Sequence, residues 1–138
     1  MESMNKLSNH LEKRSIELKK LKDKGIKLVG FSGLGYLPEE MIYASGSVPL
    51  RFIRGGDPEA VAASAAYIPR FVCPFARSQF GYRVLEEEFC YQIIDLFACA
   101  ITCQHMRRVA DLFDLYTDLD VFRLGVPHGY NTEQGLKY

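Results

Sequence analysis

The sequence predicts an α/β domain of the Rossmann-like or flavodoxin-like type, with three layers, a short parallel sheet and an amphipathic helix in front of it. Short apolar runs alternate with helical patterns, and their spacing permits crossover connections between parallel strands. The 138 residues, 48% of them hydrophobic and 25% charged, suffice for one core. We expect an N-terminal helix over 1–24 and a single α/β domain over 25–138.

The N-terminal segment has the pattern of an amphipathic helix. Its apolar residues recur at helical spacing, and they are Met4, Leu7, Leu11, Leu18 and Leu21. Gly25 is a stop signal, so the helix is expected to end near Lys24. Arg14 interrupts the narrow apolar stripe, which predicts that the helix lies across the body of the domain or against a partner subunit.

The first half of the domain contains two strand–turn–helix units. The apolar run 26–32 predicts a buried parallel strand, and Pro38 then suits the first position of a helix. A second strand is predicted over 47–54. It is followed by a helix that Asp57 caps and Pro58 opens.

The second half continues the alternation. Good helix formers follow Pro74, and the run 93–102 is the most hydrophobic of the chain and predicts a central strand. Helical spacing returns from Cys103 onward, and a last strand is expected over 120–128. The final "NTEQGLKY" has the character of the first turn of a new helix.

Composition and charge restrict the possible partners. Seventeen basic residues balance 17 acidic ones, which argues against nucleic acid as the main partner. No apolar run approaches the roughly 20 residues of a membrane helix, and the N-terminus is too polar for a signal peptide. We therefore expect a cytoplasmic protein whose four cysteines form no disulfide framework.

The turns at the carboxyl ends of the strands are the places to look for a ligand site. The first turn carries Gly30, Gly33 and Gly35, but it matches neither GxGxxG nor the GxxxxGK[ST] loop. A flexible backbone near a ligand is expected there, with dinucleotide binding only weakly indicated. Glu39 and Glu40 lie in the first turn of the next helix, where a carboxylate also matches the helix dipole.

Two cysteines follow predicted turns at this same edge. Cys73 precedes Pro74 and is predicted at a helix N-cap, and Cys103 lies at or just inside the next helix start. Free N–H groups and the positive dipole end favour a thiolate at such positions, so two of them are able to share an iron or zinc centre. The alternative is that each is a small buried hydrophobic residue. Cys90 and Cys99 are expected in the core.

The other candidate groups are weaker. Neither His10 nor His128 has a plausible catalytic triad around it, and GxSxG is absent. A third hypothesis is a small zinc or thiol-redox protein that uses Cys99, Cys103 and His105. The cysteine spacing matches no CxxC zinc pattern, however.

From about Lys27 onward the sequence resembles the 2-hydroxyacyl-CoA dehydratase and benzoyl-CoA reductase family. The resemblance rests on ordered blocks: "VGFSGLGYLPEEMIYASGSVPLRF", "AAYIPRFVCPFARSQFG", "TCQHMRRVADLF" and "GVPH" before "GLKY". It implies a cytoplasmic, oxygen-sensitive subunit that holds a 4Fe-4S cluster, pairs with a related subunit as a heterodimer, and receives electrons from an ATP-dependent activator protein. The chemistry implied is radical elimination of water from an acyl-CoA, or reduction of an aromatic acyl-CoA.

The resemblance also assigns residues. It implies that Cys73 and Cys103 are cluster ligands, whereas the family's third cysteine lies in a downstream domain that this sequence does not contain. For that reason we expect the isolated chain to be inactive. We expect it to be the part of a lyase or acyl-CoA reductase that precedes the downstream domain. Family members usually carry an acidic residue and a glycine after the second cysteine, and this chain has "QHMRR" there.

Four further residues are candidates for the substrate side. Tyr36 and Glu40 belong to the glycine-rich turn and the helix after it, and Arg77 and Ser78 follow Cys73 by about one helical turn. Each of the last two is equally compatible with an ordinary solvated helix position. The competing function is a non-catalytic domain or scaffold without a cluster, which binds a partner subunit through its N-terminal helix.

Overall fold

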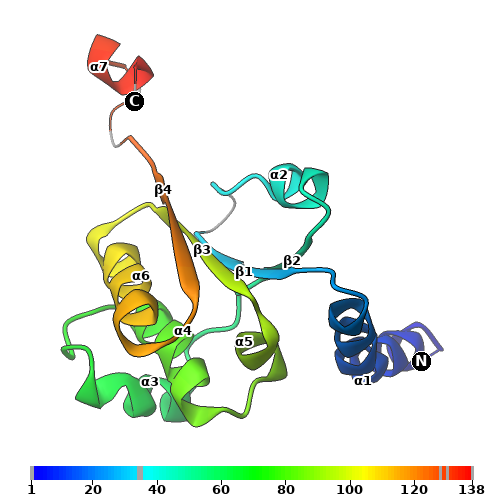
Figure 1. The fold of residues 1–138 in the computed structure, drawn as a ribbon. Helices are drawn as coiled ribbons and strands as arrows, with labels where there is room; N and C mark the ends of the chain where they lie inside the picture. The colour runs from blue at the N-terminus through cyan, green and yellow to red at the C-terminus, as the bar shows by residue number, and fades with distance from the viewer. Residues whose placement is uncertain (1, 34–35, 128, 130, 138) are drawn as a thin grey trace.

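The computed structural model describes residues 2–33, 36–127, 129 and 131–137. Its centre is a parallel sheet of four strands in the order β2-β1-β3-β4 (Figure 1). The strands are β1 (Leu28–Ser32), β2 (Val48–Arg51), β3 (Leu96–Ile101) and β4 (Asp120–Gly125). The chain adds β2 on one side of β1 and then β3 and β4 on the other, so the order in which strands are added reverses between β1 and β3. This is the flavodoxin-like arrangement, and the predicted fold class is confirmed.

Helices cover the two faces of the sheet unequally. One face carries the larger core, to which Leu28, Phe97 and Cys99 contribute from the strands, and it is covered by α3 (Pro58–Ala63), α4 (Pro74–Leu85), α5 (Phe89–Ile93) and α6 (Gln104–Tyr116). The other face carries a smaller cluster around Phe31 and Ala98, under α2 (Glu39–Ala44). The described residues therefore form three layers, with most of the helices on one face of the sheet and the short helix α2 on the other.

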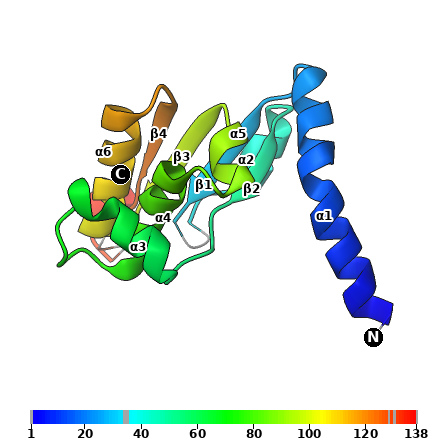
Figure 2. The same ribbon diagram turned by 90° about the horizontal axis from the view of Figure 1, so that it is seen from below.

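The N-terminal helix α1 (Glu2–Asp23) docks with only part of its length. Leu18 is fully buried in the larger core, and Gly25 follows the helix with a φ of 81°. Met4, Leu7 and Leu11, on the same stripe, are 66%, 51% and 62% exposed. Figure 2 shows this half of α1 extending away from the domain. The expectation that the helix lies across the body thus applies to its C-terminal half.

Local signals identify most helix starts. Asp57 caps α3 through a hydrogen bond from the Glu59 N–H (3.1 Å), as predicted. Pro38, expected inside the next helix, is instead the N-cap of α2. Asp57 and Pro58, at the N-cap and the first position of α3, occupy the positions that suit Asp and Pro at a helix start, whereas Pro38 lies one position earlier.

The region between α4 and β3 differs from the prediction. Glu86 ends α4 in the left-handed conformation, with a φ of 59°, and α5 then forms before β3 starts at Leu96. The apolar run from 93 to 95 therefore belongs to α5 and to the turn after it. β2 is also shorter than expected and ends at Arg51.

The last elements follow the predicted order. After β3 and α6, β4 runs parallel to β3, and the short helix α7 (Glu133–Leu136) begins at Thr132, whose hydroxyl accepts from the Gly135 N–H (3.0 Å). Within the part of the chain that the structure describes, no helix is long and apolar enough to span a bilayer.

Candidate functional site

The carboxyl ends of β1 and β3 lie side by side at the point where the strand order reverses, which is where ligands bind in open parallel sheets. β1 ends at Ser32, whose buried hydroxyl has no hydrogen-bond partner among the described residues. Gly33 follows with a φ of 131°, and a Cβ there would lie 2.5 Å from the Cβ of Ala100. Glycine is therefore required at this turn. Leu34 and Gly35 lie outside the described residues.

Cys73 is the N-cap of α4, as predicted. Pro74 occupies the first helical position, and the Cys73 sulfur accepts a hydrogen bond from the Ala76 N–H (3.4 Å). The side chain is half-buried. The helix start thus holds the thiol near free N–H groups at the positive end of α4.

Cys103 is the N-cap of α6, and its exposed side chain makes no capping hydrogen bond. The starts of α4 and α6 are joined directly, because the Cys73 N–H donates to Nδ1 of His105 (3.2 Å). The structure therefore brings the two N-caps to one edge, linked by a residue two positions after Cys103. No pattern in the sequence indicates this contact of His105, because it joins residues 32 positions apart.

The other two thiols lie elsewhere. Cys99 is fully buried in β3, and its thiol donates to the Met106 carbonyl (3.5 Å). Burial raises the pKa of Cys99 to about 12, and burial also raises the pKa of Cys90 on α5. Cys99 thus faces the core, so a zinc site built from Cys99, Cys103 and His105 is not formed. Among the described residues, no three His, Cys, Asp or Glu side chains come together as a metal-binding group.

Tyr36 and Glu40 line a common hollow of about 580 Å³ beside the carboxyl end of β2. Arg51, the last residue of β2, also lines it and forms an ion pair with Glu39. The Arg51 guanidinium lies 5.5 Å from the centre of the Phe31 ring. Sequence reasoning missed Arg51, because only the pairing of β2 with β1 brings it to the start of α2.

Arg77 and Ser78 have structural contacts. The Arg77 guanidinium donates to the Val61 carbonyl of α3 (2.8 Å), while its Nε is buried without a partner among the described residues. Ser78 is fully buried, and its hydroxyl donates to the Phe75 carbonyl (2.8 Å). Both side chains therefore lie in the packing of α4, and a role on the substrate side stays a prediction for each.

A comparison with protein families finds one model that fits this chain. It covers residues 35–138 and carries the description "2-hydroxyglutaryl-CoA dehydratase, D-component". The matched part includes β2, β3, β4 and both cysteine N-caps, and it leaves α1 and β1 outside. No curated protein matches the chain.

Proposed function

The chain belongs to the 2-hydroxyglutaryl-CoA dehydratase D-component family, and on this basis we propose that it is the N-terminal part of an iron–sulfur subunit. The enzyme type is a 2-hydroxyacyl-CoA dehydratase, which removes water from an acyl-CoA, or a benzoyl-CoA reductase. The subunit works with a related subunit and an ATP-dependent activator protein. The chain supplies part of the metal site and one wall of the substrate site.

The observation that carries the proposal is the pairing of the two helix starts. Cys73 and Cys103 are N-caps of α4 and α6, and the bond from the Cys73 N–H to His105 holds the two starts together. The positive dipole ends of α4 and α6, with their free N–H groups, then lie at the same edge of the sheet. Such an edge offsets the negative charge of a thiolate-ligated cluster.

The donor set fits two corners of a 4Fe-4S cluster. Cys73 is half-buried and Cys103 is exposed, so neither residue lies wholly in the core, whereas Cys99 is fully buried. The remaining cysteine ligand is expected from a further domain or subunit. When bound, the cluster supplies a single low-potential electron to the thioester substrate. The chain's own contribution is to fix two thiols at helix starts.

The hollow that Tyr36, Glu40 and Arg51 line is the proposed substrate side. It opens beside the carboxyl end of β2, at the sheet edge where α/β proteins bind ligands. Arg51 offers a cation that is held in place by Glu39 and by the Phe31 ring. A cation of this kind suits the anionic groups of a coenzyme A thioester.

Anaerobic reconstitution with iron and sulfide tests the metal site. We expect the purified chain to bind iron and sulfide with the visible absorption of a cluster, and Cys73→Ser and Cys103→Ser each to lose at least half of that iron. Cys90→Ser is the matched control, because Cys90 lies on α5, which precedes β3, and so at the opposite end of that strand from Cys103; it should retain wild-type iron.

Equal iron in all four proteins, or none in the wild type, would contradict the proposal. It would favour the competing function, a domain without a cluster that binds a partner subunit. Circular dichroism of each variant verifies that the fold is retained.

A further inference from the structure

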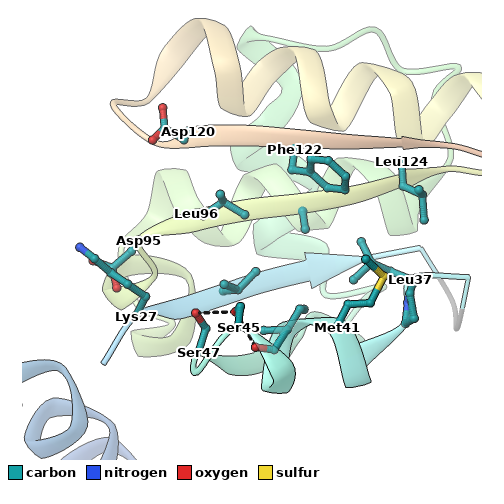
Figure 3. A pocket seen from close by; sticks show the side chains of 14 residues that line it. Lys27, Leu37, Met41, Ser45, Ser47, Asp95, Leu96, Asp120, Phe122 and Leu124 are labelled. Atoms are coloured by element: carbon teal, nitrogen blue, oxygen red, sulfur yellow. Dashed lines mark hydrogen bonds and ion pairs between the residues drawn. The ribbon is translucent and has the colours of Figure 1, made fainter. Parts of the chain in front are cut away.

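The face of the sheet under α2 is open over β3 and β4. A hollow of about 490 Å³ lies there, and Figure 3 shows its walls on α2 and on the strands. We call it the open groove, and its apolar lining is Val29, Met41, Leu96, Ala98, Phe122 and Leu124. Phe122 is 53% exposed and Met41 70% exposed. Of the residues that line it, the charged ones, Lys27, Asp95 and Asp120, lie at one end of the groove (Figure 3).

The half of α1 that extends away from the domain (Figure 2), residues 2–13, carries an exposed apolar stripe, and we call this half the overhang. Met4, Leu7 and Leu11 are exposed, and on a helical projection no charged residue of 2–13 falls within their arc. The small side chain of Ser8 borders the stripe. Residues 2–13 form about 18 Å of helix at 1.5 Å per residue, close to the roughly 20 Å of a six-residue strand such as β3. The overhang is therefore an apolar ridge of about the length of the groove.

The ridge and the groove of one chain do not meet. Leu18 fixes α1 in the core on the α3–α6 side of the sheet, and Lys22 donates to the Ile93 carbonyl of α5 (2.6 Å). The groove lies on the opposite face, beside α2. Figure 2 shows the overhang pointing away from the domain.

We propose that two copies of this chain dimerise by exchange, each placing its Met4–Leu7–Leu11 stripe in the open groove of the other. A second copy of the chain is the occupant, because each chain carries both halves of the contact. Three apolar side chains are too few for an interface of roughly 1,200–2,000 Å². A two-fold arrangement makes the contact twice, since in such an interface each patch meets its counterpart reciprocally. α1 also lies outside the residues that match the family model.

Sedimentation or light scattering of the purified full chain tests the proposal. We expect the wild type to be a dimer at micromolar concentration, and Leu11→Asp and Phe122→Asp each to be a monomer, with the dissociation constant raised at least tenfold. The controls make the same change at exposed apolar positions off the interface. Ile16→Asp, 55% exposed on the other side of α1, and Leu115→Asp, 73% exposed on α6, should remain dimers.

Mixing the two interface variants distinguishes exchange from other dimers. A mixed dimer of Leu11→Asp and Phe122→Asp keeps one intact contact, formed by the wild-type stripe of one chain and the wild-type groove of the other. The mixture should therefore associate more tightly than either variant alone, although more weakly than the wild type, and a tag on one variant should capture the other at high concentration. Should Phe122→Asp fail to fold by circular dichroism, Met41→Asp replaces it, since Met41 is 70% exposed.

Three results would overturn the proposal. The first is a monomeric wild type. The second is a Phe122→Asp variant that stays dimeric, which indicates pairing of α1 with α1. The third is a mixture of the two variants that associates no more tightly than either variant alone.

Discussion

At the scale of single residues, burial and place in the fold together separate the four cysteines into chemically different groups. Cys73, half-buried, and Cys103, exposed, begin helices at the sheet edge. Cys90 is half-buried on α5, and Cys99 is fully buried in β3. The thiols near water are suited to metal binding, and the thiol in the core is a packing residue whose proton is held tightly.

Cys99 gives the protein a measurable pH dependence. Burial raises its pKa from the usual 9.0 to about 12. The folded state therefore binds the proton more tightly than the unfolded state, and the stability from the neutral thiol is complete below pH 9 and is lost as the pH rises toward 12. We expect the free energy of unfolding to fall more steeply over this range in the wild type than in Cys99→Ala.

Urea titrations at several pH values measure this difference. Cys99→Ala should also be less stable at pH 7, by about 1 kcal/mol, because it removes a buried sulfur. Cys103→Ala is the control, since Cys103 is exposed, and it should keep the wild-type slope. Identical slopes for the wild type and Cys99→Ala would contradict the expectation.

At the scale of elements, α4 organises the helical layer. Gln79 is fully buried in it, donates to the Arg54 carbonyl (2.6 Å) and accepts from the Tyr91 hydroxyl (3.0 Å). These bonds connect α4 to the loop after β2 and to α5. Gly81 lets α3 approach closely, because a Cβ at this position would lie 1.8 Å from the Ala60 carbonyl oxygen.

Replacing Gly81 by alanine tests this close approach. In an open helix a change from glycine to alanine stabilises by roughly 0.5–1 kcal/mol. Here the added methyl group collides with the backbone of α3, so Gly81→Ala should lower the free energy of unfolding by about 3 kcal/mol. Thermal and urea unfolding measure the change. A variant as stable as the wild type would mean that α3 and α4 are further apart.

At the scale of the whole molecule, Asp95 connects segments that are far apart in sequence. Its carboxylate accepts from the Leu28 N–H at the start of β1 (2.9 Å) and pairs with Lys22 of α1 (3.4 Å) and with Lys27 (3.5 Å). One side chain just before β3 therefore fixes the beginning of β1 and the end of α1. Burial raises the pKa of Asp95, but the Leu28 N–H and the two lysines outweigh burial, and the net shift is downward.

This shift predicts a loss of stability in acid. Because the folded pKa lies below the usual 3.8, the stability from Asp95 is present above that pH and is lost as the pH falls through the folded pKa. Asp95→Asn should be less stable than the wild type at pH 7 by about 1–2 kcal/mol, and the difference should shrink in acid. Asp118→Asn, at an exposed position, serves as the control, and a difference that does not vary with pH would contradict the assignment.

Local sequence patterns were enough to predict the alternation of strands and helices, the parallel sheet and several helix starts. The caps at Asp57 and Cys73 were predictable because a cap depends on a few neighbouring residues and on the proline that follows. The apolar runs of β1 and β3 were predictable because strands buried on both faces are apolar along their length.

Which residues meet becomes known only from the folded chain. The left-handed Glu86 and the helix α5 after it, the contact of Cys73 with His105, and the hollow with Arg51 all depend on segments distant in sequence. The periodicity of α1 likewise defines one apolar stripe, but the position of α5 and the core decides that Leu18 is buried and Leu11 is exposed. Periodicity records which side of a helix is apolar, whereas burial depends on what the rest of the chain places against that side.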